Sequence, residues 1–165
     1  MMRRRIASAD PDDAEAARER CLRLLATRAR SQAELRQRLE ARGYAETVIK
    51  SVIGDLARAG LVDDEEFARS WVSGRLSAGG SGRQKLRWEL RRKGLAEELI
   101  RRHVDEAIDD GAELDSALQF ARRRVRRGAD AAKELARIRR LLLGRGYGFE
   151  TVESVLRRLP IEEEP

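Results

Sequence analysis

Apolar residues return along most of the chain at intervals of three and four positions. Behind Gly43, for example, they recur at Val48, Ile49, Val52, Ile53 and Leu56. This spacing places apolar side chains on one face of a helix. No segment of convincing length shows the strict alternation of a half-buried strand. The pattern therefore predicts an all-α fold.

One motif occurs three times, in the segments 35–44, 86–95 and 138–147. Each copy ends in a basic residue, a glycine and an apolar or aromatic residue. The three glycines, Gly43, Gly94 and Gly146, lie 51 and 52 positions apart. A cation in the last turn followed by a glycine in the left-handed conformation is typical of a helix C-terminus. These glycines are therefore predicted to form turns, not phosphate-binding loops.

An apolar helical segment precedes each motif and another follows it, so each unit is expected to contain three helices. We predict three tandem three-helix repeats over 14–61, 62–111 and 112–159, with a flexible N-terminal tail over 1–13 and a C-terminal tail over 160–165. Units this small bury little apolar surface alone and gain stability by sharing cores with their neighbours. We therefore expect an elongated, curved array.

Several helix starts can be recognised from their capping residues. Ser31, Ser81 and Asp63 each stand three positions before a Glu or Gln, which is the spacing of a capping box. Asp63 and Asp64 form a pair of carboxylates, but their place at a helix start favours capping over acid–base chemistry or metal binding.

The charge of the chain points to a polyanionic partner. The formal net charge is +6 and the pI is about 10.2, with arginine as the main basic residue. Guanidinium groups pair bidentately with phosphate or carboxylate. The alternative is that these arginines only form solvent-exposed helix faces. Whether they gather in clusters distinguishes a binding surface from an ordinary exposed face.

Two clusters of basic residues stand out. The first has Glu89 as its one acid, with Leu86 and Leu90 expected in the core, and its candidate binding residues are Arg83, Lys85, Arg87, Trp88, Arg91, Arg92 and Lys93. The second is expected on the same face of the array and comprises Arg122, Arg123, Arg124, Arg126, Arg127, Arg139 and Arg140. Both are predicted to contact partner protein or DNA phosphates.

Trp88 replaces a polar residue, since the matching positions of the other units are Gln37 and Arg140. It either packs on a neighbouring unit or is an exposed anchor of the kind found at binding hot spots or under stacked bases. The sequence leaves both interpretations open.

The chain lacks the residues that a catalytic site would need. His103 is the only histidine and matches apolar positions of the other units, and Cys21 stands in a leucine-rich segment, so both are expected to pack. No nucleotide-binding loop, zinc spacing or nucleophile elbow is present. We therefore predict a non-enzymatic protein without metal or cofactor. Since no segment approaches a membrane span or signal peptide, we expect a cytoplasmic monomer.

Three segments resemble the RecX family. Residues 61–71, LVDDEEFARSW, are similar to its central signature, residues 82–94, GRQKLRWELRRKG, to the segment that follows, and residues 30–44 to its first unit. The resemblance extends from about Ala17 to about Ala107. It implies a regulator that lies on the RecA filament on single-stranded DNA and depresses its ATPase, strand-exchange and coprotease activities, with a role in homologous recombination, DNA repair and the SOS response.

Two other functions remain open. A three-helix unit with a short glycine turn also suits a DNA-binding protein that acts independently of RecA. Sequence-specific reading is disfavoured because the chain has no asparagine and the segment 46–58 offers few side chains that recognise base edges, which leaves nonspecific binding. The third possibility is a helical scaffold for an unrelated partner.

Overall fold

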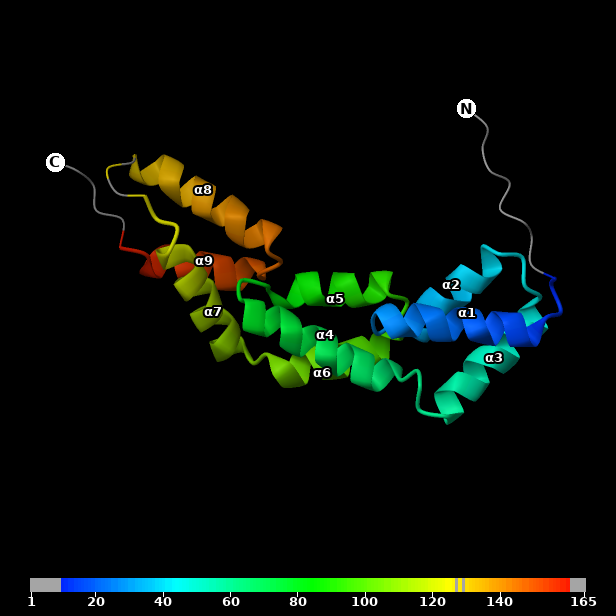
Figure 1. The fold of residues 1–165 in the computed structure, drawn as a ribbon. Coiled ribbons are helices and arrows are strands. Elements are labelled where there is room, and N and C mark those ends of the chain that lie inside the picture. The colour runs from blue at the N-terminus through cyan, green and yellow to red at the C-terminus, as the bar shows by residue number, and fades with distance from the viewer. Residues whose placement is uncertain (1–9, 127, 129, 161–165) are drawn as a thin grey trace, which may run out of the picture. The chain divides into compact units, whose positions relative to one another are not determined.

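The computed structural model describes residues 10–126, 128 and 130–160, and within these ranges it contains nine α-helices and no strand. The first five are α1 (Ala14–Thr27), α2 (Gln32–Glu40), α3 (Glu46–Arg58), α4 (Asp64–Ala78) and α5 (Arg83–Arg92). The other four are α6 (Glu97–Ala107), α7 (Asp110–Arg122), α8 (Ala131–Gly144) and α9 (Phe149–Arg158) (Figure 1). The all-α prediction is confirmed.

The described chain forms two compact units. The first contains the residues up to Phe67 together with Lys93–Leu95, and the second contains Ala68–Arg92 and the residues from Ala96 onward. In the first unit α3 packs against both α1 and α2. Its core includes Cys21, Leu35, Leu39 and Ile49, none of which is exposed. The expected burial of Cys21 is confirmed.

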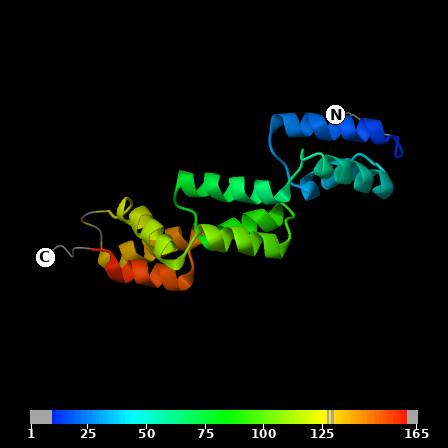
Figure 2. The same ribbon diagram turned by 90° about the horizontal axis from the view of Figure 1, so that it is seen from below.

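In the second unit α5 packs on α6, and α9 packs on α7 and α8 (Figures 1 and 2). The core of the α7–α9 part contains Ile138, Leu142, Tyr147 and Val152, each at most 1% exposed. These residues carry the helical spacing seen in the sequence, because burial of one helix face requires apolar side chains at every third or fourth position.

The helix ends follow the expected capping chemistry at most positions. Ser31 and Glu34 form a complete capping box on α2, and the Asp63 carboxylate accepts the backbone N–H groups of Glu65 and Glu66 at the start of α4. Gly43, Gly94 and Gly146 all have positive φ values, of 87°, 77° and 78°. The predicted helix-ending turns are confirmed.

The start of α5 differs from the predicted capping box at Ser81. The backbone N–H of Gln84 donates to the Gly146 carbonyl at 3.1 Å, and that of Arg83 donates to the Glu113 carboxylate at 2.8 Å. Groups distant in the sequence therefore satisfy the first turn of α5. Local capping rules do not anticipate them, because the turn before α9 comes into reach only after folding.

Most of the predicted N-terminal tail, residues 1–9, and nearly all of the C-terminal tail, residues 161–165, lie outside the described residues. Within the described part of the N-terminal segment, the Pro11 carbonyl accepts the backbone N–H of Ala45 at 2.9 Å. Residues 10–13 therefore contact the turn that follows α2. The number of repeats and their boundaries stay predictions.

Candidate partner-binding surface

Helix α5 is fixed by two leucines on its inner face. Leu86 and Leu90 are completely buried, as their four-residue spacing predicts. Burying one leucine side chain contributes about 1.5–3 kcal/mol, which is enough to set the rotation of a helix of this length. The remaining positions of α5 face its neighbours or solvent.

Three of the basic residues on α5 form ion pairs with nearby acids. Arg87 pairs with Asp105 of α6, and Arg91 makes two hydrogen bonds, of 2.7 and 2.5 Å, to Glu97. The Glu97 hydrogen bonds raise the pKa of the Arg91 guanidinium. Arg83 pairs with Asp110 at 3.0 Å. Much of the charge on this helix is therefore balanced within the second unit.

Arg83 is mainly a structural residue. Its side chain is 22% exposed, and its Nη2 donates to the Ile108 carbonyl at 2.7 Å. It thereby ties the start of α5 to the segment between α6 and α7. Of the predicted surface residues it is one of the least accessible to a partner.

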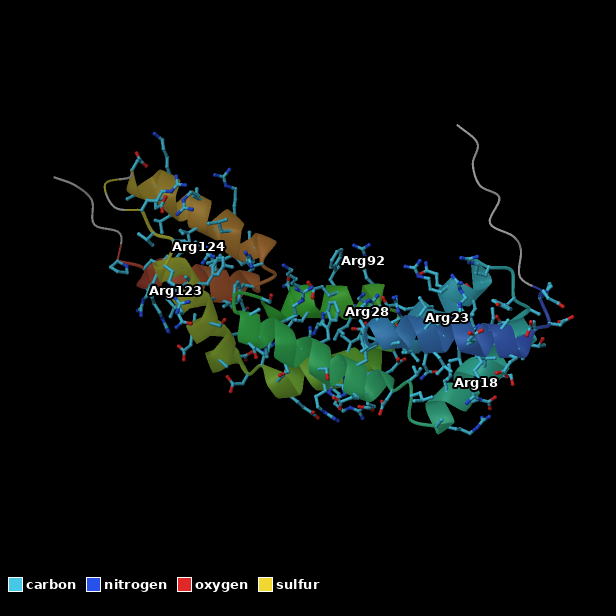
Figure 3. All side chains as sticks on the ribbon, viewed as in Figure 1. Arg18, Arg23, Arg28, Arg92, Arg123 and Arg124 are labelled. Atoms are coloured by element: carbon cyan, nitrogen blue, oxygen red, sulfur yellow. The ribbon has the colours of Figure 1, made fainter. Side chains whose placement is uncertain are left out.

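Trp88 and Arg92 are both exposed on α5. Trp88 is 53% exposed, and the Arg92 guanidinium carbon lies 4.8 Å from the centre of its indole ring. Arg92 extends away from α5 (Figure 3) and has no carboxylate partner within the described residues. About half of the Trp88 side chain is therefore open to solvent, and its role as a binding anchor stays a prediction.

The two lysines of the first cluster have different surroundings. Lys85 is half-buried, and its backbone lies directly against Gly146. Lys93 belongs to the first unit, where its Nζ pairs with Glu34 at 2.9 Å. Burial alone would raise the pKa of Glu34, but hydrogen bonds from Arg28 and Lys93 outweigh burial and lower the pKa to about 2.

The second basic cluster is divided among several environments. Arg122 and Arg123 are exposed at the end of α7, and Arg124 is exposed just beyond it. Arg139 pairs with Glu153 at 3.0 Å, while Arg140 is exposed on α8. Arg126 is exposed and its backbone N–H donates to Glu134, and Arg127 lies outside the described residues.

Within the second unit, Arg92 on α5 is well separated from Arg123 and Arg124 at the end of α7 (Figure 3). Whether the two clusters contact a partner stays a prediction.

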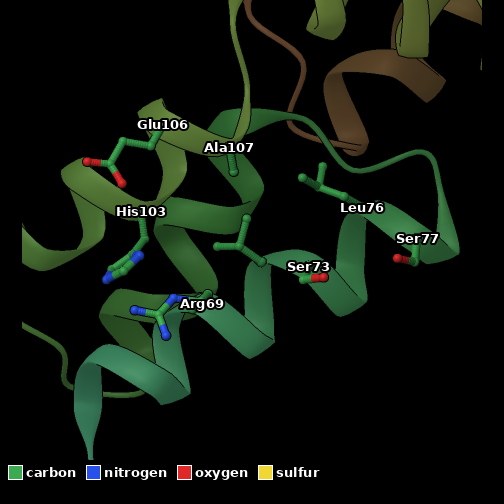
Figure 4. A pocket seen from close by; sticks show the side chains of 8 residues that line it. Arg69, Ser73, Leu76, Ser77, His103, Glu106 and Ala107 are labelled. Carbon is green, nitrogen blue, oxygen red and sulfur yellow. The ribbon is translucent and has the colours of Figure 1, made fainter.

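A third feature of the second unit is a hollow between α4 and α6, with a volume of about 390 Å³. Arg69, Ser73 and Ser77 of α4 and His103 and Glu106 of α6 are among its lining residues (Figure 4). His103 is 8% exposed, which agrees with the expected packing role. The described residues contain no group of three or more histidine, cysteine or acidic side chains that would hold a metal ion.

Sequence reasoning missed Arg145, which was interpreted only as the cation at a helix end. In the structure its guanidinium lies over the ring of Phe120, at 5.1 Å from the ring centre. The one sequence signal was the basic residue before the glycine, and that signal is fully explained by helix termination.

A search for related proteins gives consistent matches. Residues 17–56 match the first three-helix domain of RecX and residues 63–104 match its second three-helix domain. The regulatory protein RecX of Mycobacterium avium (strain 104) is 41% identical over 162 residues, which cover 95% of this chain and 92% of that protein. The regulatory protein RecX of Mycobacterium tuberculosis (strain ATCC 25177 / H37Ra) is 40% identical over 157 residues, covering 91% and 90%.

The crystal structure of RecX from Lactobacillus salivarius has the same fold, with a TM-score of 0.79 at 19% sequence identity over 90% of this chain and 97% of that one. The fold and the two domain matches define an all-helical regulatory protein with a basic surface. The chain belongs to the RecX family of regulatory proteins. No helix in the described part of the chain has the length and apolar character needed to cross a membrane.

Proposed function

We propose that this chain regulates RecA by binding its filament on single-stranded DNA and lowering its ATPase activity, and with it strand exchange and coprotease activity. Membership of the RecX family over 95% of the chain is the observation that carries this proposal. The role is regulatory and non-enzymatic. Its cellular setting would be recombination and DNA repair in the cytoplasm.

The α5 surface formed by Trp88 and Arg92 is the proposed contact with the filament. Tryptophan and arginine are the residues most enriched at binding hot spots. The Arg92 guanidinium lies over the Trp88 ring, and such a contact restricts an arginine side chain, which lowers the entropy lost when a partner carboxylate or phosphate binds. Arg87 and Arg91 are expected to contribute less, because each already has a carboxylate partner.

The decisive experiment titrates the protein into RecA that is hydrolysing ATP on single-stranded DNA. We expect ATP hydrolysis to fall as the protein is added. A variant with Trp88→Ala and Arg92→Ala is expected to need at least roughly tenfold more protein for the same effect, as is usual for loss of two hot-spot residues. Arg101→Ala on α6 is the control, since Arg101 is exposed and, among the described residues, forms an ion pair with Glu98 of its own helix.

An unchanged rate of ATP hydrolysis at every protein concentration would contradict the proposed function. Equal inhibition by the double variant and by the control would keep RecA regulation but exclude the α5 surface from it.

The second candidate is nonspecific DNA binding independent of RecA. It is supported by Arg122 and Arg123, exposed cations at the end of α7 without a carboxylate partner in the described part of the chain. Such a protein would lower ATP hydrolysis only by competing for DNA, so an excess of single-stranded DNA would restore the full rate. Regulation through the filament would persist in that excess.

A further inference from the structure

Two arginines share one aromatic ring at the end of α7. The guanidinium carbon of Arg124 lies 3.8 Å from the centre of the Phe120 ring, and that of Arg145 lies 5.1 Å from the same centre. The two guanidinium carbons are therefore separated by at most slightly more than the Debye length of physiological salt, roughly 8 Å. Their side chains come from segments that are 21 positions apart in the sequence.

The Phe120 ring that both guanidinium groups contact is held firmly. Phe120 is only 7% exposed, and it contacts the Tyr147 ring with 6.4 Å between the centroids. The backbone of Gly80 lies so close that a Cβ atom on it would be 2.6 Å from the Phe120 ring. The ring is thus a fixed base for the two guanidinium groups.

Each guanidinium is also tied to a backbone carbonyl. Arg124 Nη1 donates to the Phe120 carbonyl at 3.3 Å, and Arg145 Nη1 donates to the Gly80 carbonyl at 3.5 Å. One donor of each group is used in this way. A guanidinium has five N–H donors, so most of them remain available to a ligand.

No carboxylate among the described residues pairs with either guanidinium. The nearby carboxylate of Glu113 accepts hydrogen bonds from Arg83 and Thr151 instead. Two positive charges held on one ring without an acid repel each other, and an anion bound to both of them offsets that repulsion.

We propose that Arg124 and Arg145, stacked on Phe120, form a clamp for a backbone phosphate of single-stranded nucleic acid. Planar guanidinium groups present paired donors that match phosphate oxygens. Arg122 and Arg123, which precede Arg124 in the sequence, are also exposed, and a short run of cations fits a ligand with regularly spaced charges better than a single carboxylate. The clamp specifies which residues make the DNA contact included in the proposed function, and it does not depend on binding to RecA.

The test is the binding of a fluorescein-labelled thirty-nucleotide oligothymidylate to the full chain, measured by fluorescence anisotropy from low to moderate NaCl without RecA. Each phosphate contact contributes about 0.7 to the slope of log K against log salt for single strands. Because the clamp holds one phosphate, Arg124→Gln with Arg145→Gln should therefore reduce the slope by about 0.7 and weaken binding roughly tenfold.

Arg157→Gln with Arg158→Gln is the matched control, because it removes two exposed charges from α9 of the same unit. It should change the slope much less. Arg124→Gln alone serves as a second variant, since Arg124 is exposed and its loss leaves the core intact, and it should reduce the slope by less than about 0.7 because Arg145 remains. Circular dichroism and thermal melting verify folding.

Equal effects of the clamp variant and the control would overturn the proposal, because bulk charge would then explain both. A polyglutamate that displaces the oligonucleotide at equal charge concentration, and needs Arg124 and Arg145 to do so, would also overturn it in favour of an acidic protein ligand. Neither outcome would contradict the proposed regulation of RecA, because that function is tested by RecA ATP hydrolysis and not by binding of free oligonucleotide.

Discussion

The carbonyl oxygen of Gly146 accepts a hydrogen bond of 3.1 Å from the backbone N–H of Gln84. A second bond, of 2.9 Å, joins the N–H of Gly82 to the carbonyl of Arg145. The turn before α9 therefore acts as the cap of α5. This contact requires glycine at position 146, because a Cβ atom there would collide with the backbone and side chain of Lys85.

Gly146→Ala is expected to lower the free energy of unfolding by about 2–5 kcal/mol. The positive φ of 78° accounts for about 1–2 kcal/mol in a residue with a Cβ atom, and the collision with Lys85 adds about 1–3 kcal/mol. Urea denaturation followed by circular dichroism measures the change.

Alanine substitutions at two other glycines distinguish the cost of the positive φ from the cost of the collision with Lys85. Gly60 has φ +69° and open space around its Cβ position, so Gly60→Ala should cost only about 1–2 kcal/mol. Gly144 has open space within α8 and no positive φ, so alanine there should be neutral or stabilise by up to about 1 kcal/mol. Equal losses at positions 60 and 146 would show that the Lys85 contact contributes nothing.

Glu34 makes stability depend on pH in the acid range. Its folded-state pKa of about 2 lies below the unfolded value near 4.3, so its contribution is complete above about pH 5 and is lost as the pH falls toward 2. The pKa shift corresponds to a contribution on the order of 3 kcal/mol to the free energy of unfolding at neutral pH.

Glu34→Gln removes this titration. Its free energy of unfolding should be lower than that of the unmodified protein at pH 7, and the difference should shrink between about pH 5 and 2. Chemical denaturation at a series of pH values provides the comparison. A constant difference throughout that range would contradict the role of Glu34.

Cys21 is expected to react slowly in the folded protein. The thiol is completely buried, and burial raises its pKa, so both access and the thiolate fraction are low. Reaction with Ellman's reagent should be at least roughly 100-fold faster in denaturing urea than in buffer. Comparable rates in the two conditions would show that α1 opens readily from the first unit.

The two tryptophans are expected to report different environments. Trp71 is half-buried and its Nε1 donates to Glu89 at 2.9 Å, whereas Trp88 is 53% exposed. Acrylamide should quench the fluorescence of Trp71→Phe, which retains Trp88, more strongly than that of Trp88→Phe. The opposite order would place Trp88 in a buried site and remove it from the proposed α5 surface.

The local features of the fold could be predicted because they depend on neighbouring residues. Leu86 and Leu90 are four positions apart, so a helix necessarily places them on one face. Gly43, Gly94 and Gly146 follow helix-ending cations, and their positive φ values arise within a single turn. The capping box of Ser31 and Glu34 likewise spans only three positions.

The candidate surface was decided by tertiary structure. A run of basic residues in α5 predicts a charged face, yet Arg87 and Arg83 find their acids 18 and 27 positions away. Those acids, on α6 and at the start of α7, come near the arginines only in the folded chain. The sequence alone therefore did not distinguish the paired Arg83 and Arg87 from Arg92, which has no carboxylate partner among the described residues.

By itself, then, the sequence determined the helices, their buried faces and the turns that end them, since hydrophobic periodicity and capping act over a few residues. Only the tertiary structure decided which cations are neutralised, that Trp88 stays exposed, and that Arg124 and Arg145 meet on Phe120. Charge pairing and exposure depend on distances in space, and those distances are set when helices far apart in the chain pack together.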